Sequence, residues 1–183
     1  SRAAAGRERG ADTRTRGQAN GACASCRNRQ LHRMNDATAY AAALREARAG
    51  LAEGGIPIGA CLVVDGGILA TGRNQRVQRG SAIRHGETDC IENAGRQPAA
   101  VYARSTLYTT LSPCFMCAGT ILLYKIPRVV IGEHTHFEAS EALLREHGVE
   151  VVVLDDAETK TMFRAWLDTN PQLWNEDIGE PAG

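Results

Sequence analysis

The chain has 183 residues, of which 43% are hydrophobic, 23% charged and 5% aromatic, which is ordinary for one globular domain with a real core. Twenty-one Lys and Arg balance twenty-one Asp and Glu, so the formal net charge is zero and a uniformly basic nucleic-acid binder is disfavoured. No run approaches the roughly 18 apolar residues of a membrane helix. Because no apolar secretory block is present either, we expect a cytoplasmic protein with reduced cysteines and no membrane partner.

The charge is unevenly distributed along the chain. Residues 1–33 contain eight Arg against one Glu and one Asp, with Leu31 as the only large aliphatic residue. Such a segment cannot bury enough apolar surface to fold, so we expect a disordered basic leader, with a transit peptide as the alternative. Residues 34–183 then form the folded domain, whose thirteen basic and nineteen acidic residues suit a small neutral ligand better than a nucleic acid. We interpret Cys23 and Cys26 of the leader as incidental thiols, although His32 lies nearby in the sequence.

Hydrophobic spacing predicts alternating helices and strands after the leader. Residues 35–55 have an Asn or Asp cap, Ala-rich turns and the Gly-Gly end of a helix. The apolar runs 56–64 and 68–74 flank Asp65-Gly66-Gly67 and predict a β-hairpin. The later elements, in chain order, are helix 85–96, strand 105–111, helix 113–124, strand 127–133, helix 140–148, strand 149–155 and helix 156–170.

These elements define a fold class. A helix between two strands favours a parallel right-handed crossover, whereas the hairpin is antiparallel. We therefore expect an α/β fold in which a five-stranded mixed sheet is covered by helices on both faces.

Two short segments carry residue types that bind metals, His85-Gly86-Glu87 and Pro113-Cys114-Phe115-Met116-Cys117. A C-x-x-C turn at a helix start brings two thiolates together, and the helix N-terminus stabilises their charge. His85 supplies a third ligand, which leaves one zinc position for water, as in catalytic sites. Alone, the cysteines are also typical of a redox pair, and His-x-Glu occurs by chance on helices. Together the segments predict catalytic zinc.

Glu87 is predicted to move protons. It lies two residues beyond His85 and so points in another direction from that ligand. Zinc makes its bound water acidic, and Glu87 can take the water proton and return it to a ring nitrogen and then to a departing amine. The chemistry is hydrolytic deamination at an amidine carbon.

The pair H-x-E and P-C-x-x-C is the signature of zinc deaminases. Together with GGIPIG, ENAGR, STLYTTLSPC, IPRVVIGE, VEVVVLDD and WNEDIGE, it resembles the fungal-type cytosine deaminases across about residues 36–180. The resemblance implies a homodimer of cytidine deaminase-like α/β/α sandwiches with one Zn²⁺ per subunit. It also implies a hydrolase of pyrimidine salvage that converts cytosine to uracil and ammonia, with Glu87 as the proton shuttle and zinc held by His85, Cys114 and Cys117.

The resemblance further implies how the ring is held. Its carbonyl oxygen and amino group meet polar partners, namely Asn74, the Gly86 N–H, Asp177 and the Ser112 carbonyl. Its faces and edges meet apolar partners beside the His85 ring, namely Phe137, Trp174, Ile58 and Leu111. Without the resemblance, Asn74 is a turn residue after a strand and Trp174 anchors a terminal helix.

The sequence does not identify the substrate. If the terminal WNEDIGE segment covers the pocket, no ribose fits and a free base is preferred. Asp89, Cys90 and Phe115 depart from the family pattern, and Asp89 shares a helical face with His85. Asp89 therefore has three interpretations: its carboxylate orients the zinc ligands, contacts the substrate ring, or is solvated. The alternative substrates are therefore creatinine, isocytosine, an aminotriazine or a guanine-type base. The alternative function is a zinc-binding module without turnover.

Overall fold

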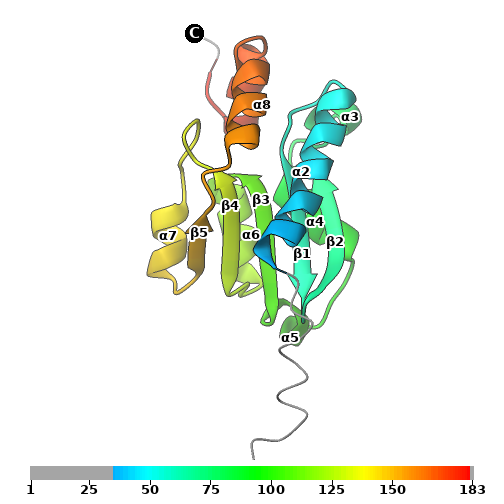
Figure 1. The fold of residues 1–183 in the computed structure, drawn as a ribbon, viewed down its shortest axis with the longest axis vertical. Coiled ribbons are helices and arrows are strands. Elements are labelled where there is room, and N and C mark those ends of the chain that lie inside the picture. Colours follow the sequence, from blue (N-terminus) through cyan, green and yellow to red (C-terminus); the bar gives the residue numbers. More distant parts are fainter. Residues whose placement is uncertain (1–34, 182–183) are drawn as a thin grey trace, which may run out of the picture. The chain divides into compact units, whose positions relative to one another are not determined.

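A five-stranded mixed sheet forms the centre of the fold (Figure 1), in a computed structural model that describes residues 35–181. The order is β2-β1-β3-β4-β5. Strands β2, β1 and β3 pair antiparallel, whereas β3, β4 and β5 pair parallel. Their bounds are β1 Gly59–Val64, β2 Gly67–Arg73, β3 Ser105–Leu111, β4 Arg128–Glu133 and β5 Glu150–Val153. The predicted mixed sheet is confirmed, while the predicted leader, with Cys23, Cys26 and His32, lies outside the described residues.

The predicted hairpin is β1 followed by β2. Asp65 and Gly66 join the strands with φ of +50° and +86°, the positive values of a turn that matches the twist of paired strands. The first strand is shorter than predicted, because Ile56 and Ile58 lie outside the ladder. Both are buried in an apolar cluster at the site, which accounts for their hydrophobic character.

Eight helices accompany the sheet within the described residues. The predicted cap of the first is present, since the Asn35 side chain accepts a hydrogen bond from the Thr38 N–H at 2.8 Å. None of the described helices is both long and apolar enough to cross a bilayer. Two four-residue helices, α3 and α5, were not predicted, and α7 is shorter than expected. The bounds are α2 Asp36–Ala52, α3 Arg76–Arg79, α4 Gly86–Ala94, α5 Ala99–Tyr102, α6 Phe115–Leu123, α7 Glu141–Glu146, α8 Ala157–Leu167 and α9 Pro171–Ile178.

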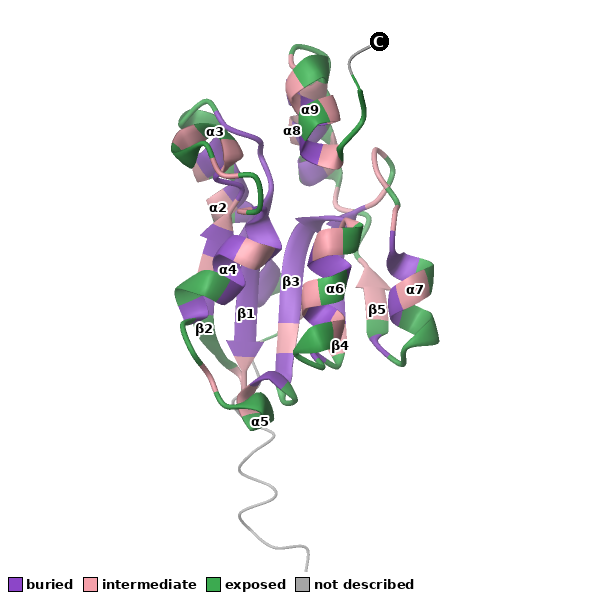
Figure 2. Ribbon diagram, turned by 180° about the vertical axis from the view of Figure 1, so that it is seen from behind, coloured by how far each residue is buried: buried purple, intermediate pink, exposed green. Residues whose placement is uncertain are grey.

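The helices cover both faces of the sheet, as predicted. Helices α4, α6 and α7 lie over one face (Figure 2), where Leu62 and Leu107 belong to the core. Helix α2 covers the opposite face, where Cys61 and Tyr108 belong to a second cluster that the α8 residue Met162 joins. Adjacent strand residues thus supply opposite faces. A third apolar cluster contains Leu111, the last residue of β3, and joins it to α8 and α9.

Gly72 allows α4 to approach β2 closely, and we expect substitution there to be costly. A Cβ at Gly72 would lie 2.2 Å from the backbone nitrogen of Cys90. Overpacking of this kind should make Gly72→Ala lower the free energy of unfolding by about 1–3 kcal/mol in urea titrations. Gly67→Ala on the same strand is the matched control, because its nearest neighbour is 3.8 Å away. Equal unfolding midpoints for the two variants would contradict the close approach.

Candidate active site

Helices α4 and α6 begin close together beyond the carboxyl end of β3. Their starts bring together an imidazole and two thiols. His85 immediately precedes α4, Cys114 immediately precedes α6, and Cys117 lies in the first turn of α6. The potential ligand atoms of these three residues all lie within 4.8 Å of one another. His85 Nδ1 and Cys114 Sγ are 3.5 Å apart. The sheet and its two helices therefore assemble a donor set from segments about 30 residues apart in sequence.

The donor set fits a zinc ion with one open position. One imidazole and two thiols are typical of catalytic zinc sites with three protein ligands, and His85 and Cys117 are buried. The close interaction of the two sulfur groups lowers the pKa of Cys114 to about 4 and raises that of Cys117 well above its ordinary value. Nearby His85 lowers the pKa of Cys114 further. One thiolate is thus favoured even before a metal binds.

Glu87 lies beside this donor set and is 3% exposed. One carboxyl oxygen, Oε2, is 3.3 Å from Cys117 Sγ, while Oε1 accepts a hydrogen bond from the Thr109 hydroxyl at 3.2 Å. Burial, together with the negative charge of the Cys114 sulfur, raises the pKa of Glu87 to about 7. The carboxyl group therefore sits next to the metal-binding atoms, in a setting that favours its protonated form more than water does.

A small cavity of about 240 Å³ opens onto these groups. Its walls combine apolar side chains with polar groups of the site. Phe137 and Trp174 meet edge to face across it, with ring centroids 5.3 Å apart. Apolar walls with a few polar groups among them are typical of sites that bind small molecules. The lining residues are Ile58, His85, Glu87, Leu111, Ser112, Cys114, Phe137, Trp174, Asp177 and Ile178.

The terminal helix α9 places Asp177 at the cavity. The carboxylate oxygen Oδ1 of Asp177 lies near three side-chain nitrogen atoms. Asn74 Nδ2 donates to Asp177 Oδ1 at 2.9 Å. His85 Nε2 lies 3.5 Å and Arg76 Nε 3.3 Å from the same oxygen. Asn74 therefore reaches the site through Asp177 instead of lining the cavity. The ring of His85 is held between Asp177 on one side and Cys114 on the other.

Three residues of the site, Arg76, Thr109 and Ile178, were not predicted from the sequence. Thr109 and Ile178 lie within the segments STLYTTLSPC and WNEDIGE, whereas no motif marks Arg76. Conversely, Gly86 does not line the cavity. It is the first residue of α4, and a Cβ there would come within 3.2 Å of the Ile58 carbonyl oxygen. A larger residue at Gly86 would therefore push α4 away from Ile58.

Asp89 and Phe115, which depart from the family pattern, both lie outside the cavity wall. Asp89 is 4% exposed, and its carboxylate accepts hydrogen bonds from Arg84 Nη1 at 2.7 Å and from the Arg73 N–H at 3.2 Å. The interpretation of Asp89 as a solvated residue is therefore wrong. Phe115 is 68% exposed. Neither position supplies a group to the cavity in this structure.

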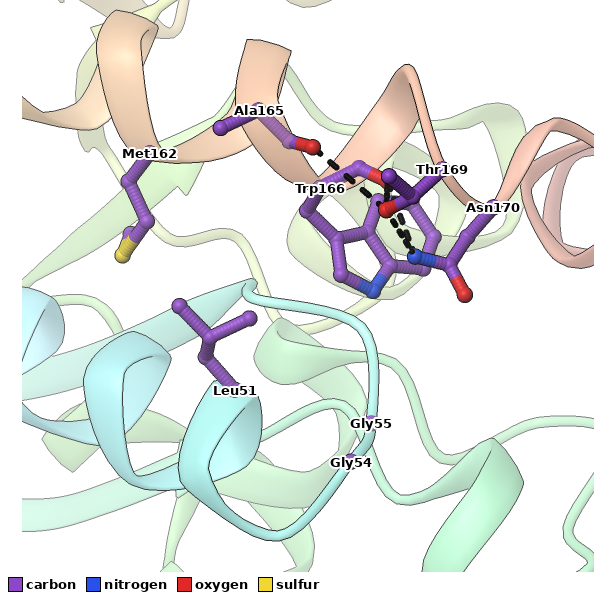
Figure 3. Close-up of a pocket in the computed structure, with 8 residues that line it drawn as sticks. All are labelled: Leu51, Gly54, Gly55, Met162, Ala165, Trp166, Thr169 and Asn170. Carbon is purple, nitrogen blue, oxygen red and sulfur yellow. Dashed lines mark hydrogen bonds between the residues drawn. The ribbon is translucent and has the colours of Figure 1, made fainter.

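A larger hollow, about 720 Å³, lies between the end of α2 and helix α8 (Figure 3). None of its lining residues is titratable. Asn170, one of its polar residues, already donates hydrogen bonds to the Trp166 carbonyl and the Thr169 hydroxyl. This hollow therefore lacks the groups that the chemistry requires. Its walls consist of Leu51, Gly54, Gly55, Met162, Ala165, Trp166, Thr169 and Asn170.

The fold and the site define a zinc-dependent hydrolytic deaminase. The sequence profile of the cytidine and deoxycytidylate deaminase zinc-binding region matches residues 33–133, and the chain belongs to this family. It is 50% identical to a cytosine deaminase of Candida albicans over 148 residues, which cover 80% of this chain and 99% of the relative.

The chain is also similar to deaminases named for other substrates. A tRNA-specific adenosine deaminase of Streptococcus pyogenes is 40% identical over 91 residues, 49% of this chain and 57% of that protein. The structure of a guanine deaminase from Nitrosomonas europaea superposes with a TM-score of 0.62 at 17% identity, and covers 85% of this chain and 98% of that one. The structural likeness supports the cytidine deaminase-like fold.

The contacts of Asp89 predict a structural effect on substitution. Asp89→Asn removes the charge that faces Arg84 and should lower the free energy of unfolding by about 1–3 kcal/mol, measured by urea titration. Zinc content and the ranking of substrates should stay the same. Glu92→Gln is the control, because Glu92 lies 3.7 Å from the same Arg84 but is 67% exposed in its side chain, where ion pairs contribute little. A changed substrate ranking in Asp89→Asn would show that its carboxylate does act on the ring.

Proposed function

We propose that this chain hydrolyses cytosine to uracil and ammonia, using one zinc ion per subunit. The reaction class rests on the donor set of His85, Cys114 and Cys117, with the buried Glu87 carboxyl 3.3 Å from Cys117 Sγ. The choice of cytosine rests on the relative from Candida albicans, a cytosine deaminase at 50% identity. Recovery of a free pyrimidine base also places the enzyme in pyrimidine salvage.

His85, Cys114 and Cys117 would hold the zinc ion, which, when bound, makes water reactive near neutral pH. Glu87 then performs the proton transfers. Its carboxylate takes a proton from the attacking water and gives it to the ring nitrogen beside the reacting carbon. A new C–O bond forms. Glu87 then takes the remaining proton of the attached hydroxyl and delivers it to the amino group, so that the C–N bond breaks, ammonia leaves and the ring carbonyl forms. Thr109 supports Glu87 by donating to Oε1.

Polar groups at the rim of the cavity would orient the ring. The Ser112 carbonyl and Asp177 accept the hydrogens of the amino group. Asp177 is suited to this because its three described partners all use Oδ1 and leave Oδ2 without those contacts. Asn74 and the Gly86 N–H bind the ring carbonyl oxygen, which requires Asn74 to turn from Asp177 toward the substrate.

Apolar groups would hold the faces and edges of the ring. A planar heterocycle gains most from aromatic side chains that stack on it or meet it edge to face. The cavity offers such contacts together with the buried His85 ring. The residues concerned are Phe137, Trp174, Ile58 and Leu111.

The same chemistry on another ring is the second candidate. A guanine deaminase shares the fold, and tRNA adenosine deaminases match about half of the chain. Two observations favour a small free pyrimidine. Trp174, Asp177 and Ile178 of α9 line the cavity, which leaves little room for a ribose, and Asp89 does not reach it. A nucleic acid is therefore not the expected substrate.

We assign the activity to a single domain, residues 34–183. The family profile begins at residue 33. The alignment with the Candida albicans enzyme spans nearly all of that protein and 80% of this chain. These matches support a boundary between a basic leader, residues 1–33, and the deaminase domain.

Ammonia release from cytosine tests the proposed reaction, and Glu87→Ala tests its mechanism. The zinc-loaded protein should produce ammonia and uracil, and Glu87→Ala should lower kcat at least about 10²–10⁴-fold, because the proton transfers are lost. The variant should keep its zinc, measured by metal analysis. Glu92→Ala on the same helix is the control, since its side chain is 67% exposed.

The outcomes separate the alternatives. Turnover of another heterocycle but not of cytosine would contradict the choice of cytosine and leave the reaction class in place. No turnover of any heterocycle by the zinc-loaded wild type would indicate a zinc-binding module without catalysis. Full activity in Glu87→Ala would contradict the proton-transfer role of Glu87.

We also propose that the chain is a homodimer whose subunits meet through α6. This helix lies on the outside of one face of the sheet (Figure 2). It exposes large apolar side chains, with Phe115 68%, Leu123 74% and Tyr124 37% exposed. Ile83, in the segment just before α4, is 65% exposed. Large apolar side chains that stay exposed on one helix, such as Phe115 and Leu123, are typical of protein interfaces.

Light scattering with size-exclusion chromatography should give twice the 19.7 kDa of one chain for the wild type. Leu123→Asp should give a monomer, because burying a charge between two apolar surfaces is unfavourable. Leu69→Asp is the control, since Leu69 is an exposed apolar residue of β2, 39% accessible. A monomeric wild type would contradict the proposed dimer, and dissociation by both substitutions would contradict its location.

A further inference from the structure

The turn between β3 and α6 is held by groups outside it. The Ser112 N–H donates to the Glu133 carbonyl at 3.1 Å, and the Ser112 hydroxyl donates to Glu141 Oε1 at 3.1 Å. The carbonyl of Pro113 accepts a hydrogen bond from the Ser140 hydroxyl. Pro113 has no N–H, and the turn lies beyond the sheet ladder. Its position therefore depends on these three bonds.

Ser140 and Glu141 depart from the usual behaviour of a helix start. A Ser that precedes a helix normally caps its free N–H groups, but Ser140 makes no such bond to α7 and donates to Pro113 instead. A Glu in the first turn is normally exposed, whereas Glu141 is 1% exposed. Both side chains are directed to the turn before α6. Departures from the usual local sequence preferences are expected at functional sites.

The Glu141 carboxylate has a fixed position. Besides the Ser112 hydroxyl, Oε1 lies 3.0 Å from His134 Nδ1, and Oε2 accepts from Arg145 Nη2 at 3.0 Å. A buried carboxylate is stable only when donors surround it. The three donors occupy both oxygens, so Glu141 serves as a rigid acceptor for the Ser112 hydroxyl.

We propose that Glu141 is a positioning residue for the active site. Through the Ser112 hydroxyl it fixes the turn, and with it the Ser112 carbonyl and the Cys114 sulfur, which lies two residues further along the chain. These two groups have the roles given under the proposed function, on which the inference rests. Groups that hydrogen-bond around a metal site commonly change metal affinity or activity 10–100-fold when they are removed.

Ser112→Ala and Glu141→Gln test this role. Each should speed the release of zinc to a chromogenic chelator by about tenfold. In the Co²⁺-loaded proteins, the absorption bands of cobalt bound to thiolates should shift, because the Cys114 sulfur is displaced. The kcat/KM for cytosine should fall by about tenfold as well. In the double variant the two effects should not add, because Glu141 acts on the turn through the Ser112 hydroxyl, which Ser112→Ala already removes.

Ser105→Ala is the matched control. Ser105 lies at the opposite end of β3 and is 1% exposed, and its hydroxyl donates to the Tyr102 carbonyl at 2.7 Å. Loss of this bond should lower the melting temperature about as much as Ser112→Ala does. It should leave zinc release and the Co²⁺ spectrum unchanged, since no part of the site depends on it.

Equal zinc release and equal spectra for Ser112→Ala and Ser105→Ala would overturn the inference, as would full additivity in the double variant. Ser112→Ala keeps the test decisive should Glu141→Gln fail to fold. The metal readouts need no substrate. A wild type that does not deaminate cytosine would therefore contradict the proposed function and leave the role of Glu141 to be decided by zinc release and the spectra.

Discussion

The starts of α4 and α6 lie close together beyond the carboxyl end of β3, and this contact brings the potential metal ligands of the site together. His85 and Cys114 each stand immediately before a helix, and their side chains approach within 3.5 Å. Helix N-termini favour negative charge, so a thiolate is stabilised where the two helices converge. The sheet supplies the rigidity that holds both starts in place, because α4 and α6 pack on the same face through a shared core.

Burial gives the polar groups of the site their chemical character. Glu87 is 3% exposed, so its pKa rises to about 7, while its contacts with Thr109 and Cys117 hold it in one orientation. Asp177 is also buried, beside Asn74, His85 and Arg76. Burying charged groups is costly unless partners surround them. The partners that offset this cost also determine where each side chain points, so stability and positioning come from the same contacts.

The terminal helix α9 determines the size of the cavity. Trp174, Asp177 and Ile178 line it together with Phe137. Trp174 also packs edge to face on Phe163 of α8, with centroids 5.1 Å apart, so α9 is anchored to the body through an apolar cluster. A tRNA-specific adenosine deaminase is similar over about half of this chain, and a guanine deaminase has a similar fold. One fold can thus carry different functions, and the residues that line the pocket distinguish them.

Features that depend on residues close together in the chain were predictable from the amino-acid sequence. The C-x-x-C turn, the Asn35 cap, the positive-φ turn at Asp65 and the alternation of helices and strands are all local, and the structure contains each of them. The family resemblance also named nine of the ten cavity-lining residues. Local geometry and a long motif are sufficient for such predictions.

Only the tertiary structure decided which side chains meet across the fold. Asn74 and Asp177 are 103 residues apart in sequence, and Ser112 and Glu141 are 29 apart, yet each pair is joined by a hydrogen bond. Asp89 shares a helical face with His85, but its carboxylate is bound by Arg84 and the Arg73 N–H. A helical position specifies a direction along its own helix. The partner found there depends on how separate elements pack, and that is fixed by the burial of the whole core.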